Sequence, residues 1–219
     1  MEGRFTVHGA AGSGSIPVEA ALTLLGLPYD VVETPTWEGE AERDKVSKVN
    51  PMRQIPALVT PDGETLTESA AILIWLADRF RDRRVLSPAI DDPRRGQFLR
   101  WMAFVSASIY AFYWVRDEPS RLVGDDKAAQ AAVLDRTAER IAHNWRAMDE
   151  QVTPGRYILG DDLTVLDFYV AVASRWRPLR PRFYREAPKL AEVVRRVDQL
   201  PQLAEFWPKR FPFEGDYAA

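Results

Sequence analysis

Hydrophobic and polar positions change their spacing along the chain, and the first part reads as strands alternating with a helix. Residues 5–8 and 29–33 are short β-prone runs that flank an apolar segment at 16–25. Ser15 stands where a helix N-cap is expected and Gly26 where a helix ends in a left-handed residue. The pattern therefore predicts strand, helix and strand, followed by a polar loop with a helical turn at 34–49.

The segment 50–80 carries the densest pattern. Two short β-prone runs, 57–59 and 65–67, are separated by Pro-Asp-Gly at 61–63, which is typical turn chemistry. A helix is expected from Glu68-Ser69 onward. Its apolar residues follow the i, i+3, i+4 spacing of one helix face: Ile72, Trp75, Leu76 and Phe80.

After residue 92 the helical spacing dominates, with long apolar segments at 97–115 and 125–151. Shorter helices are expected at 187–198 and 201–207. Between the long segments and these shorter helices, Thr164 and Asp167 have the spacing of a capping box, with Leu163 and Phe168 placed to form a hydrophobic staple. We therefore predict an α/β plus all-α fold: a thioredoxin-like βαβαββα domain at 1–82, a linker at 83–92 and an all-helical domain at 93–219.

Composition removes several classes of function. The chain of 219 residues has a net charge of −3 with both signs mixed, so no nucleic-acid partner is expected. No uninterrupted apolar run reaches the roughly 18–20 residues of a membrane span, and no signal-peptide pattern begins the sequence. We therefore expect no membrane partner and a cytoplasmic protein. Without cysteine, and with two histidines far apart in sequence, no metal site is expected.

Two short features of the 50–80 segment carry candidate chemistry. A proline at position 56 cannot donate to a strand ladder, and a cis Ile55–Pro56 bond would leave the Ile55 amide and carbonyl free for an extended ligand. Ser69 at a helix N-terminus offers a hydroxyl and an amide to an anion, and Glu68 can hold an ammonium group. An α-amino acid end of a ligand fits that pair. Taken separately, an ordinary helix cap and an edge-strand proline explain the same residues.

The order NPMRQIPAL, turn, ESAAI at 50–72 resembles the glutathione-binding segment of the glutathione S-transferase superfamily. The resemblance implies a cytoplasmic homodimer that takes glutathione as cosubstrate and acts in detoxification. It assigns glutathione binding to Gln54, Ile55, Glu68 and Ser69. It also places the Thr164–Asp167 box in a buried helix whose role is folding.

In this superfamily a Tyr, Ser or Cys near the first helix contacts the glutathione sulfur. Here no tyrosine precedes Tyr29, and the cysteine of the bacterial Cys-type enzymes would fall on or near Gly14. The chain therefore departs from that pattern, and Ser13 and Ser15 are the candidate catalytic residues, with Ser13 favoured because Ser15 is better placed as a cap. The serine would donate a hydrogen bond to the thiolate.

The aromatic segment 97–115 supplies the candidate substrate pocket, with Phe104, Ser108 and Tyr113 on it, although plain core packing explains most of its residues. An arginine cluster broken by prolines, at 175–185, is first interpreted as a solvated face and second as a border of the cleft. The function implied is attack of the glutathione thiolate on a small hydrophobic electrophile. A glutathione-dependent isomerase of the maleylacetoacetate type, whose usual cysteine is missing here, and a non-catalytic interaction protein remain the alternatives.

Overall fold

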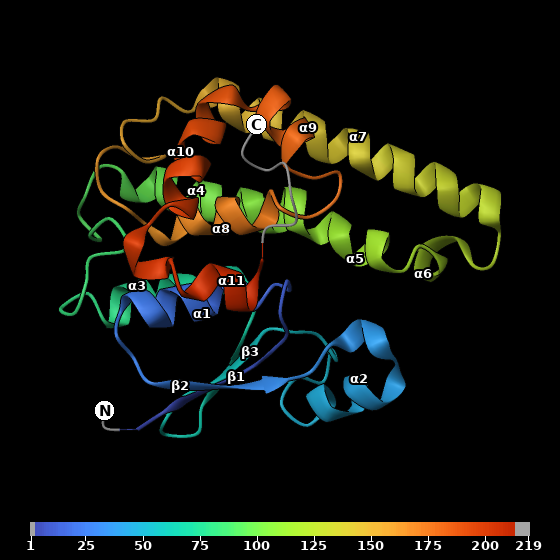
Figure 1. Ribbon diagram of the computed structural model, residues 1–219, viewed down its shortest axis with the longest axis horizontal. Helices are drawn as coiled ribbons and strands as arrows, with labels where there is room; N and C mark the ends of the chain where they lie inside the picture. Colours follow the sequence, from blue (N-terminus) through green and yellow to red (C-terminus); the bar gives the residue numbers. More distant parts are fainter. Residues whose placement is uncertain (1–2, 213–219) are drawn as a thin grey trace.

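A computed structural model describes residues 3–212, and its N-terminal part is built on one mixed sheet (Figure 1). The strand order is β2-β1-β3-β4. Strand β1 (Phe5–Gly9) runs parallel to β2 (Tyr29–Glu33) and antiparallel to β3 (Ala57–Val59), and β4 (Thr65–Thr67) is antiparallel to β3. The predicted strands are confirmed.

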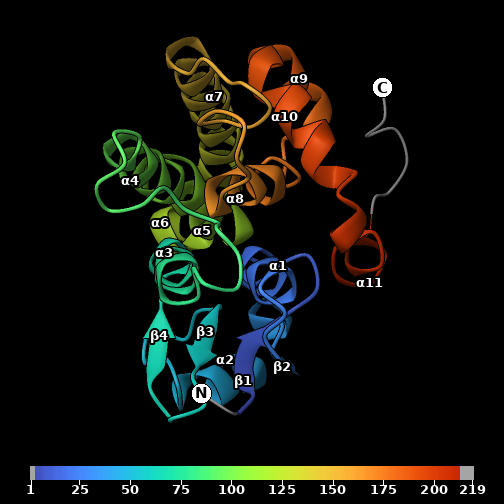
Figure 2. The ribbon, with the colours of Figure 1, turned by 90° about the vertical axis from the view of Figure 1, so that its left-hand side faces the viewer.

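Two helices of this part, α1 (Ile16–Leu24) and α3 (Ser69–Arg79), contact each other and lie on the sheet face turned toward the helical part (Figure 2). The segment predicted as a loop with one helical turn holds more helix than expected. It contains a 3₁₀ turn, η1 (Thr36–Glu38), and a helix of two turns, α2 (Glu40–Ser47). Acidic residues in the first turn of α2 interact favourably with the helix dipole and stabilise the helix. The sequence pattern did not predict this helix because the segment is mostly polar.

The rest of the chain is helical. In chain order the elements are α4 (Arg95–Phe104), the π-helical η2 (Val105–Tyr110), α5 (Ala111–Asp117), α6 (Ser120–Val123), α7 (Lys127–Gln151), α8 (Val165–Ala173), α9 (Arg180–Glu186), α10 (Pro188–Asp198), the 3₁₀ turn η3 (Pro201–Leu203) and α11 (Phe206–Arg210). Every residue of α8 is buried, and this helix contacts α1 and α3 below it and α4, η2 and α10 around it. The predicted fold class is confirmed, while the linker bounds at 83 and 92 stay a prediction.

One continuous helical segment, Arg95–Asp117, is long and apolar enough by length and composition to cross a membrane, which the sequence pattern alone had not indicated. Polar residues interrupt its apolar run, but the mean hydropathy of the segment stays high enough for a membrane span. In this fold α7 and α8 pack against the segment and bury Phe98, Trp101 and Ile109, and 39% of its most apolar 18-residue window is buried.

The arginine cluster is the clearest correction. Arg175 and Arg180 are 3% and 0% exposed, and both form ion pairs with Asp198, at 2.7 and 2.8 Å. Burial lowers the pKa of Arg175 to about 10. The interpretation as a solvated face is therefore wrong for these two residues, because Asp198 at the end of α10 pairs with both of them inside the protein. Arg182 lies further out and pairs with Glu139 at 2.7 Å.

The capping box at the start of α8 is confirmed. One carboxylate oxygen of Asp167 accepts from the Thr164 amide at 2.7 Å and from its hydroxyl at 2.9 Å, and the other accepts from the Ile158 amide at 2.8 Å. Asp167 is fully buried, and burial raises its pKa to about 6 against the opposing effect of these hydrogen bonds.

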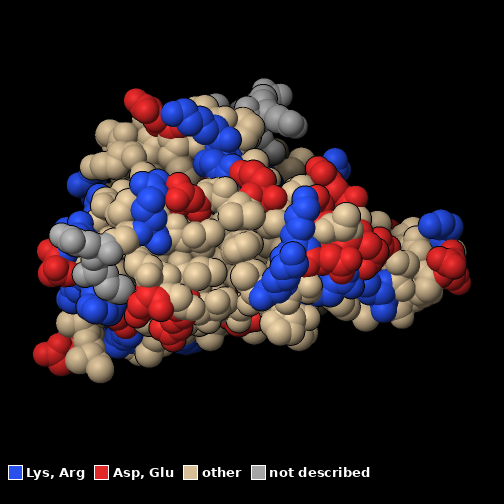
Figure 3. All heavy atoms as spheres, turned by 90° about the horizontal axis from the view of Figure 1, so that it is seen from below, with Lys and Arg blue, Asp and Glu red and all other residues tan. Residues whose placement is uncertain are grey.

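On the surface seen from below, basic and acidic side chains lie next to one another (Figure 3).

Candidate functional site

The junction between β4 and α3 has an unusual backbone. Glu68, the residue before the helix, has φ 64° and ψ 104°, a left-handed conformation that non-glycine residues rarely adopt. Its side chain is exposed and does not cap the helix, while Ser69 begins the helix with a 6% exposed side chain. Such strained positions concentrate at functional sites. The junction therefore sets an exposed carboxylate, which makes no cap bond to the helix, beside a helix N-terminus.

The Ser69 hydroxyl is held from the helical part of the molecule. It lies 2.9 Å from the phenol oxygen of Tyr169, a fully buried residue of α8. Burial raises the pKa of Tyr169 to about 12, and hydrogen bonds to Ser69 and Ser106 oppose that rise. The phenol therefore stays protonated near neutral pH and fixes the orientation of the serine. Sequence reasoning missed Tyr169, because nothing local links residues that are 100 positions apart.

The loop before β3 holds the second candidate for ligand binding, the backbone amide and carbonyl of Ile55. The Ile55–Pro56 peptide bond is cis. Ile55 is half-buried, and its amide and carbonyl make no backbone hydrogen bond to other residues of the described chain. Gln54 is exposed, and its backbone carbonyl accepts from the Asn50 side-chain amide at 2.8 Å, which holds the loop in shape.

The glycine-rich loop places its two serines inside the protein. Ser15 is fully buried, and its hydroxyl donates to a carboxylate oxygen of Glu19 at 2.6 Å rather than capping α1. Ser13 is 7% exposed, and its oxygen lies 3.0 Å from that of Ser15. Since a hydroxyl has one hydrogen and that of Ser15 goes to the carboxylate, Ser13 is the donor in the contact between the two serines. Both hydroxyl groups are therefore engaged in hydrogen bonds inside the protein.

Glu19 connects this loop to the end of the chain. It is fully buried and forms an ion pair with Arg210 of α11, at 2.5 and 3.0 Å, and Arg210 also pairs with Glu33. The Gly12 amide donates to the Arg210 carbonyl at 2.8 Å. The bonds of the two serines thus belong to a network that fixes the loop against α11, while their assignment as catalytic residues stays a prediction.

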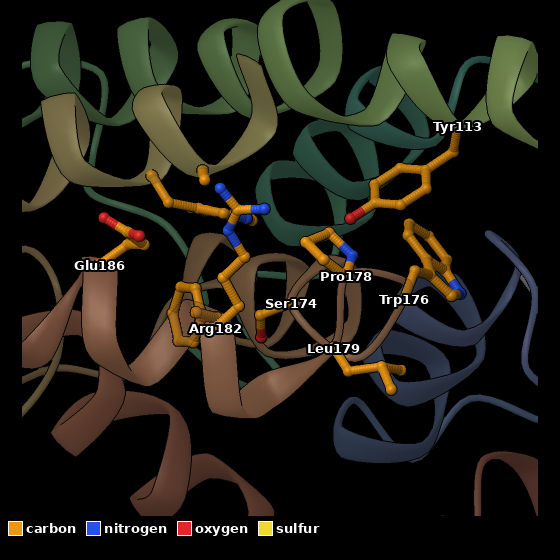
Figure 4. Close-up of a pocket in the computed structure, with 10 residues that line it drawn as sticks. Tyr113, Ser174, Trp176, Pro178, Leu179, Arg182 and Glu186 are labelled. Carbon is orange, nitrogen blue, oxygen red and sulfur yellow. The ribbon is translucent and has the colours of Figure 1, made fainter. Parts of the chain in front are cut away.

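Of the three residues predicted to line a substrate pocket, Tyr113 lines a cavity that Phe104 and Ser108 do not line. Tyr113 lines a cavity of about 10 Å³ inside the helical part, next to Ser174 and Trp176 (Figure 4). That volume holds about one water molecule, so this cavity cannot take a substrate. The Tyr113 hydroxyl donates to the Ala173 carbonyl at 3.2 Å. Its burial raises the pKa of the phenol.

The other two residues lie off the lining of that cavity. Phe104 is half-buried and packs edge-on against Trp101, with ring centroids 5.4 Å apart. Ser108 is half-buried, and its carbonyl accepts from the Asn144 side chain. A pocket for the electrophile therefore stays a prediction.

Comparison with known proteins agrees with this arrangement. A model of the glutathione S-transferase N-terminal domain matches residues 15–79, and a model of the C-terminal domain matches residues 120–210. The GST-like protein YncG of Escherichia coli, whose function is uncharacterised, is 30% identical over 200 residues, covering 91% of this chain and 95% of YncG. The chain therefore belongs to the glutathione S-transferase superfamily.

Two further relatives extend the comparison. A maleylacetoacetate isomerase of Mus musculus is 27% identical over 169 residues, covering 73% of each chain. A glutathione transferase homolog from Sulfitobacter, crystallised with bound glutathione, superposes with a TM-score of 0.81 at 21% identity, covering 94% of this chain and 98% of its own. This likeness establishes the shared fold.

Proposed function

We propose that the protein is a glutathione transferase that binds glutathione at the β4–α3 junction and activates its thiol for attack on a small hydrophobic electrophile. The observation that carries the proposal is the left-handed Glu68 placed before Ser69 at the start of α3. An exposed acidic side chain on the residue directly before a helix N-terminus suits the ammonium and carboxylate of one amino acid.

The γ-glutamyl end of glutathione has both charges on one carbon. In the proposed complex its carboxylate accepts from the Ser69 amide and hydroxyl, and its ammonium group pairs with Glu68. Because Tyr169 already holds the Ser69 oxygen at 2.9 Å, the serine needs no rearrangement to receive the ligand. A preorganised donor loses less conformational entropy on binding.

The middle of the tripeptide is assigned to the loop before β3. There the Ile55 amide and carbonyl, unpaired in backbone hydrogen bonds within the described chain, would pair with the cysteinyl backbone in the manner of an added strand. Gln54, exposed beside them, is the remaining candidate contact. This extended pose would carry the sulfur toward the glycine-rich loop at the start of α1.

The protein's task at the sulfur is electrostatic. Lowering a thiol pKa from about 8.5 to about 6.5 takes roughly 2.7 kcal/mol of preferential stabilisation of the thiolate. One charge-assisted hydrogen bond and a helix N-terminus supply energies of that order. The nucleophile is then the sulfur of the cosubstrate, and the chain, which has no cysteine, forms no covalent intermediate through a thiol of its own.

The mouse isomerase relative supports a second candidate, a glutathione-dependent isomerase of the maleylacetoacetate type. Both candidates use the same glutathione site and differ in the fate of the adduct after thiolate addition. In the transferase the carbon–sulfur bond remains, whereas in the isomerase it breaks after rotation about the former double bond. We propose a cytoplasmic homodimer for either activity.

The test is calorimetric titration with reduced glutathione, followed by turnover of chlorodinitrobenzene and of a cis-enediolone such as maleylacetone. Saturable binding with conjugation supports the transferase, and binding with isomerisation alone supports the second candidate. Binding without either reaction would point to a non-catalytic member of the superfamily. If millimolar glutathione neither binds nor raises the melting temperature, the proposed site is wrong.

A further inference from the structure

The position at which the resemblance places a cysteine is occupied from another part of the chain. Gly14 is buried, and a Cβ atom built on it would lie 1.8 Å from the phenol oxygen of Tyr110 and 2.8 Å from the ring carbon that carries it. No side chain fits there while Tyr110 keeps its place. The hydroxyl that reaches position 14 therefore comes from the π-helical turn η2.

Tyr110 is held firmly in this position. Its ring packs edge-on against Trp176, with centroids 5.1 Å apart, and lies tilted 6.3 Å from Tyr169. The Trp176 indole in turn donates to the carbonyl of Gly12 at 2.7 Å. The ring is thus fixed between the glycine-rich loop and α8, whose Tyr169 holds Ser69.

The hydroxyl of Tyr110 has no hydrogen-bond partner among residues 3–212. Three other tyrosines differ in this respect: Tyr29 bonds to the Thr23 hydroxyl at 3.0 Å, Tyr113 to a backbone carbonyl and Tyr169 to Ser69. A half-buried phenol without a partner retains an unused donor. By contrast, the hydrogens of Ser13 and Ser15 are already used inside the loop.

We propose that Tyr110, supplied by the helical part of the chain, is the catalytic residue that donates a hydrogen bond to the glutathione sulfur above Gly14. The inference rests on the proposed glutathione site and deepens it. The thiol releases its proton to solvent, the phenol keeps its own proton, and its O–H bond points at the sulfur anion. The two serines then fix the shape of the loop.

The electrostatics of the site suit a donor rather than a base. Burial is the main cause that raises the pKa of Tyr110, and the ionisable groups facing it add to the rise: Tyr169 of α8, Asp117 of α5 and Glu68 before α3. The phenol therefore remains neutral over the range in which a glutathione thiol titrates. A neutral phenol stabilises an adjacent thiolate through a charge-assisted hydrogen bond.

The test is the ultraviolet absorbance of the thiolate of bound glutathione, titrated with pH in the wild type, Tyr110→Phe and Ser13→Ala. A charge-assisted hydrogen bond of about 1.5–3 kcal/mol corresponds to a change of roughly 10–150-fold in the ratio of thiolate to thiol. Tyr110→Phe is expected to lower this ratio by that factor at fixed pH below the wild-type midpoint. Ser13→Ala, which removes a contact inside the loop, is expected to shift the midpoint much less than Tyr110→Phe does.

Two controls separate this role from a general defect. Tyr29→Phe removes a phenol hydroxyl on β2 and should titrate like the wild type. S-methylglutathione, which has no ionisable thiol, should bind equally to the wild type and to Tyr110→Phe. If Tyr110→Phe binds S-methylglutathione with unchanged affinity and raises the midpoint of the glutathione thiol, a merely structural role of Tyr110 does not explain the result.

A second variant reaches the same hydroxyl from the other side. Gly14→Ala keeps the phenol but forces it aside, so it should also raise the midpoint, and combining it with Tyr110→Phe should add little further loss. If Tyr110→Phe binds glutathione and its thiol titrates with the wild-type midpoint, the role of Tyr110 is wrong, while the proposed glutathione site stands. A shift confined to Ser13→Ala would lead to the same conclusion. Failure of the wild type to bind glutathione or its S-methyl form would remove the site itself.

Discussion

The first turns of α8 and α3 both combine a hydroxyl with a carboxyl side chain, and the two turns use that pair in opposite ways. At α8 the carboxylate of Asp167 turns inward and accepts from two backbone amides and the Thr164 hydroxyl. At α3 the backbone of Glu68 is left-handed, its side chain is exposed, and the adjacent Ser69 is held by Tyr169. The same residue types build a closed cap at α8 and, in our proposal, an open, preorganised site at α3.

The difference lies in where the unpaired groups of the helix end are satisfied. A helix N-terminus leaves amides that need acceptors. In α8 the protein supplies the acceptor itself, which stabilises the helix and leaves nothing for a ligand. In α3 no side chain caps the first turn, and we propose that the ligand's carboxylate does so instead. On this proposal, the two helix starts differ in the partners of their first turns rather than in their residue types.

The largest expected effect is on the closed cap. Asp167→Ala removes the acceptor of the Ile158 and Thr164 amides, and leaving two buried amides unpaired should cost about 2–5 kcal/mol of unfolding free energy. Urea denaturation measures the loss, with the exposed Asp82→Ala as control. Glutathione affinity of the folded variant should be unchanged. A folded variant of wild-type stability would show that the cap is not a structural one.

The next effect concerns pH. Burial raises the pKa of Asp167 from 3.8 to about 6, so the folded protein binds this proton more tightly than the unfolded chain does. The resulting stabilisation is complete below about pH 4 and is lost as the pH rises through about 6, an amount on the order of 3 kcal/mol. Unfolding free energies measured across that window should show this slope. Asp167→Asn, which cannot titrate, should lack it, and an identical slope in both would assign it to other groups.

At the open site the main effect should appear in binding. Ser69→Ala removes one donor to the ligand's carboxylate and should weaken glutathione binding by about 1–3 kcal/mol, the scale of a hydrogen bond to a charged group. Calorimetry measures the affinity, and thermal unfolding serves as the control for the lost contact with Tyr169. Full affinity in a folded Ser69→Ala protein would place the carboxylate elsewhere.

The smallest effect is expected at Glu68. Because its side chain is exposed, its pairing with the ligand's ammonium is screened by solvent and should contribute at most about 1 kcal/mol. Glu68→Gln should therefore weaken glutathione binding by up to roughly fivefold, more at low salt than at high salt. An effect that does not depend on salt would argue against an ion pair.

Much of the fold follows from local sequence patterns, and the exceptions have physical reasons. The strands, the turn at 61–63, the helix from Ser69 and the capping box of α8 were all predicted, since each depends on neighbouring residues. The two turns of α2 were underestimated because a mostly polar helix has little apolar periodicity to detect. Arg175 and Arg180 were misplaced because their partner, Asp198, comes from a separate helix.

The candidate site divides in the same way. The motif identified Glu68 and Ser69 because an acid–serine pair before an apolar helix is a contiguous signal. It gave no indication of Tyr110, which is 96 positions from Gly14 and reaches it only through the packing of η2 on the loop. The serines beside Gly14 looked available in sequence, and their inward bonds to Glu19 and to each other became visible only in three dimensions.

The amino-acid sequence alone therefore determined the elements, the superfamily resemblance and the residues that head α3, because each depends on periodicity, turn chemistry or a short motif. Tertiary structure decided which of the many hydroxyl and charged groups are already paired and which remain unused. Pairing is a contact between distant segments, and no local pattern specifies it. In this protein the packing of η2 on the glycine-rich loop places the hydroxyl of Tyr110 next to Gly14, where the sequence had suggested a residue of the loop itself.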